Sequence, residues 1–299
     1  MMYHRINNEI EQISDTGATL RVEKSPSEQL LLSVLTSNPP DAADQLKRAL
    51  PFQPRSYRDF MLFEAHYYGV AMGMTSLYRP SAHHLARLYS FLTGGGEFPL
   101  FKPHPLWYQQ PIFYQSNHLA FYHDGAPIRY PKYAEYLDVE LELGVVLGKE
   151  LCNATPQEAE DAIAGFCVFN DFSVRNVQMA EMDSGFGPQH SKCFANSISS
   201  TVVSADEVIP KLSNLRGRVI INDKVVKECK ADSWQFSIGE AIAHASRSTR
   251  LYPGEFFGSG TFPSGAGIEH AAFQLRVGDV VRLEIDGVGS VTNTIVAED

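Results

Sequence analysis

Short apolar runs and alternations of apolar and polar residues fill the chain from about residue 115 onward, a pattern typical of β-strands. These runs predict strands at 119–122, 137–147, 164–169, 199–203, 217–221, 280–285 and 289–296. Helical spacing intervenes at 156–164, 174–182 and 238–247. We therefore expect a β-rich α+β fold in which mixed sheets curl into a barrel-like or roll-like body.

Residues 1 to about 55 mix short strands with helical stretches. Helical spacing predicts helices at 27–35 and 41–50, the second stopped by Pro51, and more helical structure from 56 to 92. The chain then becomes irregular because three consecutive glycines, 94–96, are followed by Pro99, Pro103, Pro105 and Pro111. A boundary near residue 115 is expected to separate a smaller N-terminal α/β domain, 1–115, from a C-terminal domain, 116–299.

The charge balance limits the kinds of partner that the protein can have. The 299 residues include 35 acidic and 25 basic side chains, and no basic cluster interrupts this excess of negative charge. A small-molecule ligand is therefore expected, rather than a nucleic acid or an anionic membrane. The N-terminus carries no apolar run and the stretch 30–35 is far too short to span a bilayer, so we expect a cytoplasmic protein.

Three carboxylates alternate with apolar residues in the predicted strand 137–147. In an extended chain Asp138, Glu140 and Glu142 point to one side, about 6.5 to 7 Å apart, while Val139 and Leu141 point to the other. Carboxylates this close repel one another unless one is protonated or a cation lies between them. A divalent ion bound by oxygen atoms would meet this need. The alternative is a strand face exposed to solvent.

A second polar set follows the predicted buried strand 164–169. If a helix opens near Asp171, the i, i+4, i+7 spacing places Asp171, Arg175 and Gln178 on one face. Their position at the end of a strand favours a functional role, because sites are commonly built there. The alternative is structural, with Asp171 as an N-cap and Arg175 as its partner within the helix.

A third set lies in the N-terminal region. Asp59 and His66 are seven residues apart, so on a helix they would lie on one side, two turns from each other. A histidine in such an aromatic-rich helix is more often a packed or capped residue than a catalyst. This pair by itself therefore does not decide between a functional and a structural role.

Together these segments resemble the fumarylacetoacetate hydrolase family from about residue 56 onward. The resemblance includes the Glu-x-Glu strand at Glu140 and Glu142, the strand-end pair Asn170-Asp171, and the following Ser173, Arg175 and Gln178. It continues with Gly187-Pro188, Lys192 and Phe194, with Pro253-Gly254-Glu255, Ser259-Gly260-Thr261 and Glu269, and with Gly278-Asp279 and Asn293 near the end. Asp59 followed by His66 is similar to the hydrolase-proper branch of the family.

The resemblance implies a metal site whose four ligands are Asp59, Glu140, Glu142 and Asp171. All four are carboxylates, which suits Mg²⁺ and also Mn²⁺ or Ca²⁺. Lys192 and Arg175 would offset the remaining negative charge and hold an anionic substrate. The ion would polarise a keto or diketo substrate and stabilise the enolate that forms when a carbon–carbon bond breaks.

The resemblance also implies residue roles in catalysis. His66 would activate water, and Glu269 would orient His66, with Glu64 as the local rival for that role. The expected substrate-binding residues are Gln178, Tyr114 and Thr261. A homodimer is implied as well.

Two departures from the family pattern leave the substrate open. Met61 stands where the hydrolase proper has a tyrosine, and Asn176 stands where the family commonly has an aspartate. The chain is also shorter than the tyrosine-degrading hydrolase of the family, and an arginine of that enzyme's substrate pocket has no clear counterpart here, so fumarylacetoacetate itself is not the expected substrate.

We predict a metal-dependent hydrolase that cleaves a carbon–carbon bond in a small acylpyruvate or β-diketone. The first alternative is a keto-acid decarboxylase, tautomerase or hydratase, because the same enolate serves all of these reactions. His66 discriminates between them: hydrolysis needs a base that activates water, so His66→Ala should abolish cleavage and leave enolate-forming tautomerisation partly intact. The alternative of a different class is a non-catalytic module that binds a small molecule.

Overall fold

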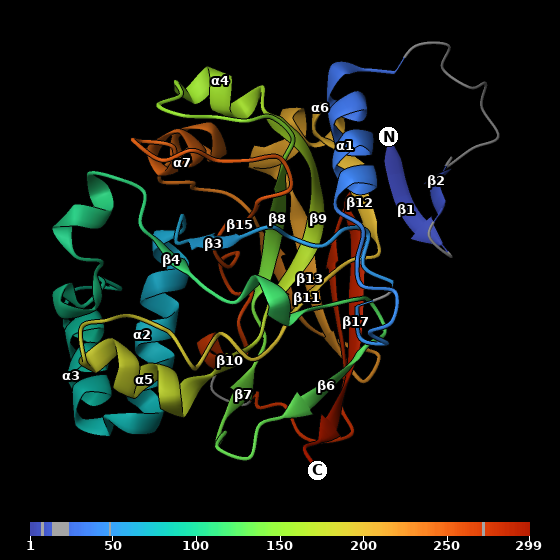
Figure 1. Cartoon of the computed structure of the whole chain (residues 1–299). Coiled ribbons are helices and arrows are strands. Elements are labelled where there is room, and N and C mark those ends of the chain that lie inside the picture. The colour runs from blue at the N-terminus through green and yellow to red at the C-terminus, as the bar shows by residue number, and fades with distance from the viewer. Residues whose placement is uncertain (7–8, 14–23, 48, 271–272) are drawn as a thin grey trace.

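A computed structural model of the chain describes residues 1–6, 9–13, 24–47, 49–270 and 273–299. Its body consists of a ten-stranded and a five-stranded sheet, with a two-stranded ribbon and helices around them (Figure 1). The strands of the larger sheet are β1 (Met2–Ile6), β2 (Glu9–Ile13), β3 (Tyr57–Phe60), β4 (Phe113–Gln115), β5 (Phe121–Tyr122), β8 (Leu141–Leu147), β9 (Ile163–Asp171), β11 (Asn196–Ile198), β12 (Thr201–Ser204) and β15 (Phe256–Gly258).

The remaining strands form the smaller sheet and the ribbon. The smaller sheet contains β6 (Pro127–Tyr130), β13 (Arg216–Ile221), β14 (Lys224–Lys230), β16 (Val280–Ile285) and β17 (Gly289–Ala297). The ribbon pairs β7 (Leu137–Asp138) with β10 (Ser173–Val174). The order of the larger sheet is β2-β1-β12-β9-β8-β15-β3-β4, with β11 paired to β9 and β5 paired to β11, and the order of the smaller sheet is β14-β13-β16-β17-β6. Both orders have free ends, so neither sheet closes into a barrel within the described residues.

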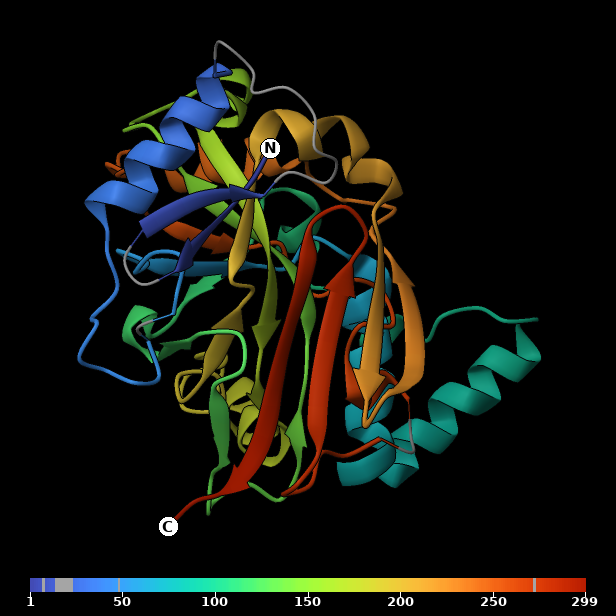
Figure 2. The same cartoon turned by 90° about the vertical axis from the view of Figure 1, so that its right-hand side faces the viewer.

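Helices surround the sheets on several sides. The α-helices are α1 (Pro26–Ser37), α2 (Glu64–Tyr78), α3 (Pro80–Leu92), α4 (Pro156–Glu160), α5 (Arg175–Asp183), α6 (Ala205–Val208) and α7 (Ile238–Ala245). The 3₁₀ helices are η1 (Pro99–Phe101), η2 (Pro105–Tyr108), η3 (His118–Ala120), η4 (Ile209–Asn214) and η5 (Gly267–Glu269). In Figure 1 α2, α3 and α5 lie together at one side, and in Figure 2 α3 points away from the body. No helix in the described part of the chain is both long and apolar enough to cross a bilayer.

The ten-stranded sheet is covered on both faces. On one face Leu143 and Val145 of β8 belong to the same apolar cluster as Leu283 of β16, on the smaller sheet. On the other face Val146 shares a cluster with Leu31 of α1. Figure 2 shows the smaller sheet and α1 in these positions. As a result all seven residues of β8 are buried, and any charge on this strand lies in a low-dielectric interior.

The β-rich α+β fold that the sequence predicts is confirmed. The strands expected at 164–169, 217–221, 280–285 and 289–296 are present within about two residues, and the helix expected at 27–35 is α1. The long strand expected at 137–147 is divided, because its middle leaves the ladder between β7 and β8. The domain boundary near residue 115 stays a prediction, and strands from both sides of it share the ten-stranded sheet.

Two sequence-based helix predictions are wrong. The described residues of 41–50 form turns, in which the Asp41 and Asp44 side chains accept hydrogen bonds of 2.9 Å from the amides of Ala43 and Leu46. A short aspartate side chain can satisfy the backbone locally in this way and so competes with a helix. The helical prediction for 56–92 is wrong at its start, since β3 pairs with β15 and β4 there.

Candidate active site

Three buried carboxylates converge from three strands of the ten-stranded sheet. Asp59 lies on β3, Glu142 on β8 and Asp171 at the last position of β9. β8 pairs with β9, and β15 joins β8 to β3, so distant stretches of sequence meet in the sheet. One oxygen from each carboxylate lies within 4.8 Å of the other two. We call Asp59, Glu142 and Asp171 the acidic centre.

Gly258 on β15 lies between two of these carboxylates. Its backbone pairs with Asp59 on one side and with Gly144 on the other. A Cβ atom at this position would overlap Asp59 Oδ1 and would lie 2.6 Å from Glu142 Oε2. Only glycine leaves room for both side chains. Gly258 has no chemical group that a sequence pattern could single out, although it directly precedes the Ser-Gly-Thr element at 259–261.

The Ser-Gly-Thr element holds Glu142 in place. The Gly260 amide donates to Glu142 Oε2 at 3.0 Å, and Thr261 Oγ1 donates to Oε1 at 3.2 Å. Gly260 has a φ of +78°, a left-handed conformation that favours glycine and turns its amide toward the carboxylate. Thr261 therefore contacts the acidic centre, and its role in substrate binding stays a prediction.

Burial and mutual repulsion disfavour negative charge at the acidic centre. Burial, followed by the charge of Asp171, raises the pKa of Asp59 to about 8. Burial, followed by the charges of Asp59 and Asp171, raises the pKa of Glu142 well above its ordinary value. Burial also raises the pKa of Asp171, to about 6, although the charge of Lys192 opposes this rise. Without a cation the centre therefore holds protons near neutral pH.

The side chains of the acidic centre fit a hard divalent ion. They offer carboxylate oxygens alone, the ligands that Mg²⁺, Mn²⁺ and Ca²⁺ prefer. Asp59 Oδ1 is buried and has no hydrogen-bond partner within the described part of the chain, so it is available as a ligand. A cation among the three groups would remove the repulsion that raises their pKa values.

Glu140 lies beside the acidic centre in a different electrostatic environment. Lys192 Nζ donates to Glu140 and, at 2.5 Å, to Asp171 Oδ2, while Arg175 Nη1 lies 2.8 Å from Glu140 Oε1. Burial alone would raise the pKa of Glu140, but Lys192 and Arg175 outweigh it and hold that pKa below its ordinary value. Glu140 is not one of the three clustered carboxylates, and its role as a metal ligand stays a prediction.

Arg175 is fully buried among protein partners. Its Nε donates to Asp138 Oδ2 at 2.8 Å, and its Nη1 donates to Gln178 Oε1 at 2.7 Å. The predicted helix face that joined these residues to Asp171 is wrong, because Asp171 ends β9 and the ribbon strand β10 intervenes before α5 begins. We call Asp138, Glu140, Arg175 and Lys192 the charged cluster. The substrate-holding roles of Arg175, Lys192 and Gln178 stay predictions.

His66 lies in the first turn of α2 and is 1% exposed. Its Nδ1 lies 2.8 Å from Glu269 Oε1, and its Nε2 lies 4.0 Å from Glu140 Oε1. The helix predicted to carry both Asp59 and His66 is wrong, since Asp59 lies on β3 before the helix begins. The tertiary structure nevertheless brings His66 beside the charged cluster.

Glu269 is the glutamate that contacts His66. Glu64, the local rival, instead accepts a hydrogen bond from the Tyr108 hydroxyl. The carboxylate of Glu269 is also held by the backbone amides of Ser264, at 3.0 Å, and of Ala266, at 3.1 Å. It therefore meets the imidazole in a fixed orientation.

Two glycines on α2 allow the Glu269 segment to approach the helix. A Cβ atom at Gly69 would lie 2.5 Å from Glu269 Oε2, and one at Gly73 would overlap the carbonyl oxygen of Ile268. His66, Gly69 and Gly73 are spaced i, i+3, i+7, so they share one helix face. This spacing is visible in the sequence, but the partner of that face is defined only by the fold.

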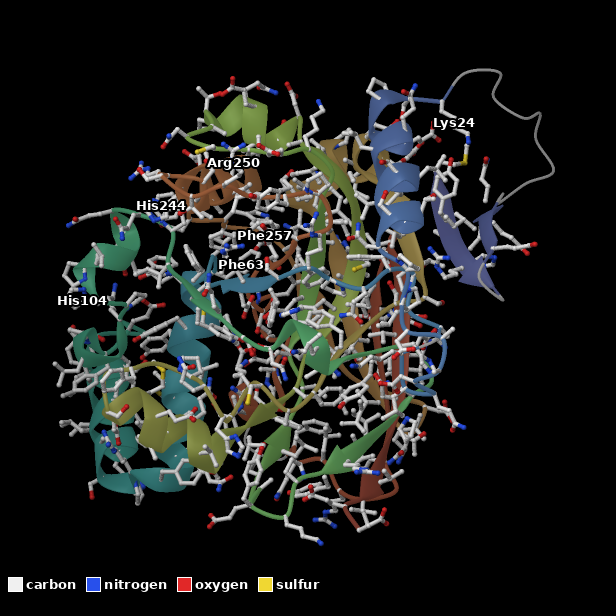
Figure 3. All side chains as sticks on the ribbon, viewed as in Figure 1. Lys24, Phe63, His104, His244, Arg250 and Phe257 are labelled. Atoms are coloured by element: carbon white, nitrogen blue, oxygen red, sulfur yellow. The ribbon has the colours of Figure 1, made fainter. Side chains whose placement is uncertain are left out.

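Tyr114 on β4 completes the contacts of Asp171. Its hydroxyl donates to Asp171 Oδ2 at 2.6 Å, and its ring packs edge-on against Tyr57 with centroids 6.2 Å apart. Its role in binding a substrate stays a prediction. Figure 3 shows His104 at the outer edge of the molecule and Phe257 of β15 inside the body.

Fold and site together define a class: an α+β protein with a buried carboxylate centre, suited to a divalent ion, beside a histidine–glutamate pair. Residues 78–296 match the family model described as fumarylacetoacetate (FAA) hydrolase C-terminal. The chain belongs to this family, and the resemblance seen in the sequence is confirmed.

Named relatives carry out several reactions. An oxaloacetate tautomerase of Xenopus laevis, a mitochondrial protein, is 32% identical over 191 residues, which are 63% of this chain and 59% of that protein. A bifunctional isomerase/decarboxylase of homoprotocatechuate catabolism from Escherichia coli is 32% identical over 172 residues, 56% of this chain and 37% of that protein. The chain thus spans less than two thirds of the length of either relative.

Solved structures share the fold. An HpcE-type protein from Mycobacterium smegmatis aligns over 100% of both chains with a TM-score of 0.68 and 21% identity. A fumarylpyruvate hydrolase from Pseudomonas aeruginosa, solved with Mn²⁺ and pyruvate, aligns over 82% of this chain and 91% of that one with a TM-score of 0.59 and 20% identity. At these identities the likeness shows the fold alone.

Proposed function

We propose that the protein is a metal-dependent hydrolase that cleaves a carbon–carbon bond in a small acylpyruvate or β-diketone, with His66 activating water. The observation that carries this proposal is the contact of His66 Nδ1 with Glu269, 2.8 Å long. When Nδ1 carries the proton that Glu269 accepts, Nε2 keeps a free lone pair. Nε2 faces Glu140, which belongs to the charged cluster. In that position Nε2 can act as a base on a water molecule.

Asp59, Glu142 and Asp171 are the residues that would hold a divalent ion, with Glu140 added by the family resemblance. Mg²⁺ is the first candidate, and Mn²⁺ or Ca²⁺ would also fit. A bound ion polarises the keto groups of the substrate and stabilises negative charge that develops on them. The Mn²⁺ and pyruvate of the Pseudomonas aeruginosa fumarylpyruvate hydrolase support a small keto acid and an ion in this fold.

His66 Nε2 takes a proton from water, and the hydroxyl adds to the acyl carbonyl carbon of the substrate. The bond from that carbon to the next carbon then breaks, and its electron pair passes to the adjacent ketone as an enolate. The proton held by His66 returns to the enolate carbon, which leaves a carboxylic acid and a ketone or keto acid. Glu269 orients the imidazole and stabilises its positive charge between these steps.

Lys192 and Arg175 of the charged cluster hold the pKa of Glu140 below its ordinary value, so this carboxylate stays ionised. Lys192 contacts both Glu140 and Asp171, so it links the charged cluster to the acidic centre. Burial alone would lower the pKa of Lys192, but Asp171 and Glu140 hold that pKa above its ordinary value, so the ammonium remains charged. In the proposed reaction Lys192 and Arg175 offset the charge of an anionic substrate.

The test is an assay of the Mg²⁺-loaded protein with a panel of acylpyruvates, β-diketones and oxaloacetate, with products followed by mass spectrometry. Hydrolysis adds the mass of water across the cleaved products, decarboxylation loses carbon dioxide, and tautomerisation changes no mass. We expect hydrolysis products, and His66→Ala should reduce their formation by about 10² to 10⁴. His83→Ala on α3 is the matched control, since His83 contacts the backbone oxygen of Met72 outside the site.

A paired comparison tests the glutamate that orients His66. Glu269→Gln should slow hydrolysis strongly, whereas Glu64→Gln should leave it near the wild-type rate, because Glu64 contacts Tyr108. Turnover of every panel compound at the wild-type rate by His66→Ala would contradict the proposed hydrolysis.

A second function, keto-acid tautomerisation or decarboxylation, is favoured by the named activities of the Xenopus laevis and Escherichia coli relatives. The same panel separates it from hydrolysis, because these reactions need no added water. His66→Ala would then retain part of the activity. Two results together would support a non-catalytic binding module. Calorimetric titration with Mg²⁺ and Mn²⁺ would detect no binding, and the protein would convert no compound of the panel.

A further inference from the structure

We propose that Asp138 is a positioning residue that fixes the segment carrying Glu269 and thereby the orientation of His66. This proposal rests on the proposed function in so far as His66 acts as a base. Asp138 is completely buried at the end of β7 and does not touch the imidazole. Its effect on the reaction therefore passes through other residues.

The carboxylate of Asp138 binds the backbone of the Glu269 segment directly. Its Oδ2 accepts a hydrogen bond of 2.9 Å from the amide of Ile268, the residue before Glu269. The same oxygen accepts from Arg175 Nε at 2.8 Å, while Oδ1 accepts from the amide of Val139 at 2.8 Å. A buried carboxylate with three donors is fixed in position, because moving it would leave charged and polar groups unpaired.

Close packing from both sides leaves the Glu269 segment little room to shift. On the side of Asp138, a Cβ atom at Gly267 would overlap Asp138 Oδ1. On the opposite side, a Cβ atom at Gly73 of α2 would overlap the Ile268 carbonyl oxygen. Ile268 also belongs to a small apolar cluster with Met74 of α2. The short helix η5 is thus held between Asp138 and the helix that carries His66.

The geometry has a specific consequence for catalysis. A shift of η5 would change the 2.8 Å contact between Glu269 and His66 Nδ1, and a displacement of about 1 Å can cost about a hundredfold in rate. Asp59, Glu142 and Asp171 have no hydrogen bond to Asp138 among the described residues, so the acidic centre would keep its ligands. A defect at Asp138 is therefore expected in turnover and not in ion binding.

The first test compares Asp138→Asn with Asp124→Asn. Asp124 is a matched control, since its carboxylate accepts a 2.7 Å hydrogen bond from the Thr292 amide on the smaller sheet. Asp138→Asn should lower kcat for hydrolysis by about tenfold to a hundredfold, with KM within about twofold of wild type. Mn²⁺ affinity by calorimetry should stay within about threefold. In a His66→Ala background, Asp138→Asn should cause no further loss.

The second test does not depend on turnover. Hydrogen exchange followed by mass spectrometry should show faster exchange at 264–270 in Asp138→Asn, and not in Asp124→Asn, because asparagine is uncharged and offers one acceptor oxygen in place of two, which weakens the hold on the Ile268 amide. Gly73→Ala disturbs η5 from the α2 side and should reproduce both the kcat loss and the faster exchange. This variant keeps the test decisive should Asp138→Asn fail to fold.

The outcomes separate the two proposals. A wild-type protein without turnover of any panel compound would contradict the proposed hydrolase, while the exchange experiment would still decide the role of Asp138. Unchanged exchange at 264–270 in the folded variants would overturn the positioning role. A kcat equal to that of Asp124→Asn, or a loss that persists in the His66→Ala background, would overturn it as well.

Discussion

The acidic centre and the charged cluster are neighbours with the same burial and opposite electrostatics. Both draw on one stretch of sequence, since Glu142 belongs to the first and Glu140 to the second. Glu140 is paired with Arg175 and Lys192, which hold its pKa below the ordinary value against the effect of burial. Glu142 faces Asp59 and Asp171, and burial with their charges raises its pKa well above the ordinary value.

The difference shows that burial alone does not determine how a carboxylate behaves. Both glutamates are at most 4% exposed, so desolvation acts on both. What differs is the charge of the groups within contact distance, cations for Glu140 and carboxylates for Glu142. The protein thus supplies its own cations at one position and leaves the other to be neutralised by protons or by a bound ion.

The largest expected effect separates the two glutamates by stability. Glu140→Gln should lower the free energy of unfolding of the metal-free protein by about 3 to 5 kcal/mol, because it leaves two buried cations without their shared partner. Glu142→Gln should cost about 1 kcal/mol or less, since burial and the charges of Asp59 and Asp171 raise the pKa of Glu142 and so favour its neutral form, which glutamine resembles. Urea unfolding at pH 7 in a chelator measures both. Equal losses of stability in the two variants would contradict the distinction between Glu140 and Glu142.

The next effect concerns ion binding, for which Glu142 is expected to matter most. Glu142→Gln should weaken Mn²⁺ binding by about a hundredfold or more, because it removes a charged ligand from the acidic centre. Calorimetric titration measures this, with Glu255→Gln as a matched control, since the buried Glu255 pairs with Arg58 instead. Wild-type affinity in Glu142→Gln would mean that the ion binds elsewhere.

A third prediction concerns pH. The pKa values of Asp171 and Asp59, about 6 and about 8, lie above their ordinary value, so in the metal-free protein these groups lose their protons only as pH rises. An ion needs the charged forms, and its affinity should therefore increase between pH 6 and pH 8, by up to about tenfold per unit for each proton released.

Calorimetry in buffers of different ionisation enthalpy measures the released protons directly. Glu142→Gln should release fewer protons than wild type per bound ion. Binding without proton release across this pH range would contradict the assignment of raised pKa values to the acidic centre.

The smallest expected effect concerns Tyr114, which contacts the acidic centre through Asp171. Tyr114→Phe removes a hydrogen bond to Asp171 that is 2.6 Å long, and it should cost about 0.5 to 1.5 kcal/mol in stability. The pKa of Asp171 should rise further, because burial raises it and the lost hydrogen bond opposed that rise. Tyr122→Phe is the control, as Tyr122 lies on β5 outside the site. Ion affinity measured at pH 6 should fall a few-fold in Tyr114→Phe alone.

Much of the site could be predicted from sequence because its residues sit in ordered local patterns. The Glu-x-Glu strand and the Asn-Asp at a strand end carry the family resemblance that placed Glu142 and Asp171 at one site, and the structure brings an oxygen of each within 4.8 Å of the other. Local pattern failed for Asp59, which lies on a strand and not on the helix of His66. That strand is stabilised by pairing with β15, about 200 residues away, which no local window contains.

The sequence by itself determined the β-rich α+β class, the family and the carboxylates and imidazole available for chemistry, because these follow from residue types and local spacing. Only the tertiary structure decided which charges meet: Glu140 with Lys192 and Arg175, Glu142 with Asp59, and His66 with Glu269 rather than Glu64. It also revealed what Gly258 and Asp138 contribute. Gly258 leaves room for the side chains of Asp59 and Glu142, and Asp138 is the residue that we propose holds the Glu269 segment in position. Electrostatic energy depends on distances between residues far apart in the chain, and only the folded protein sets those distances.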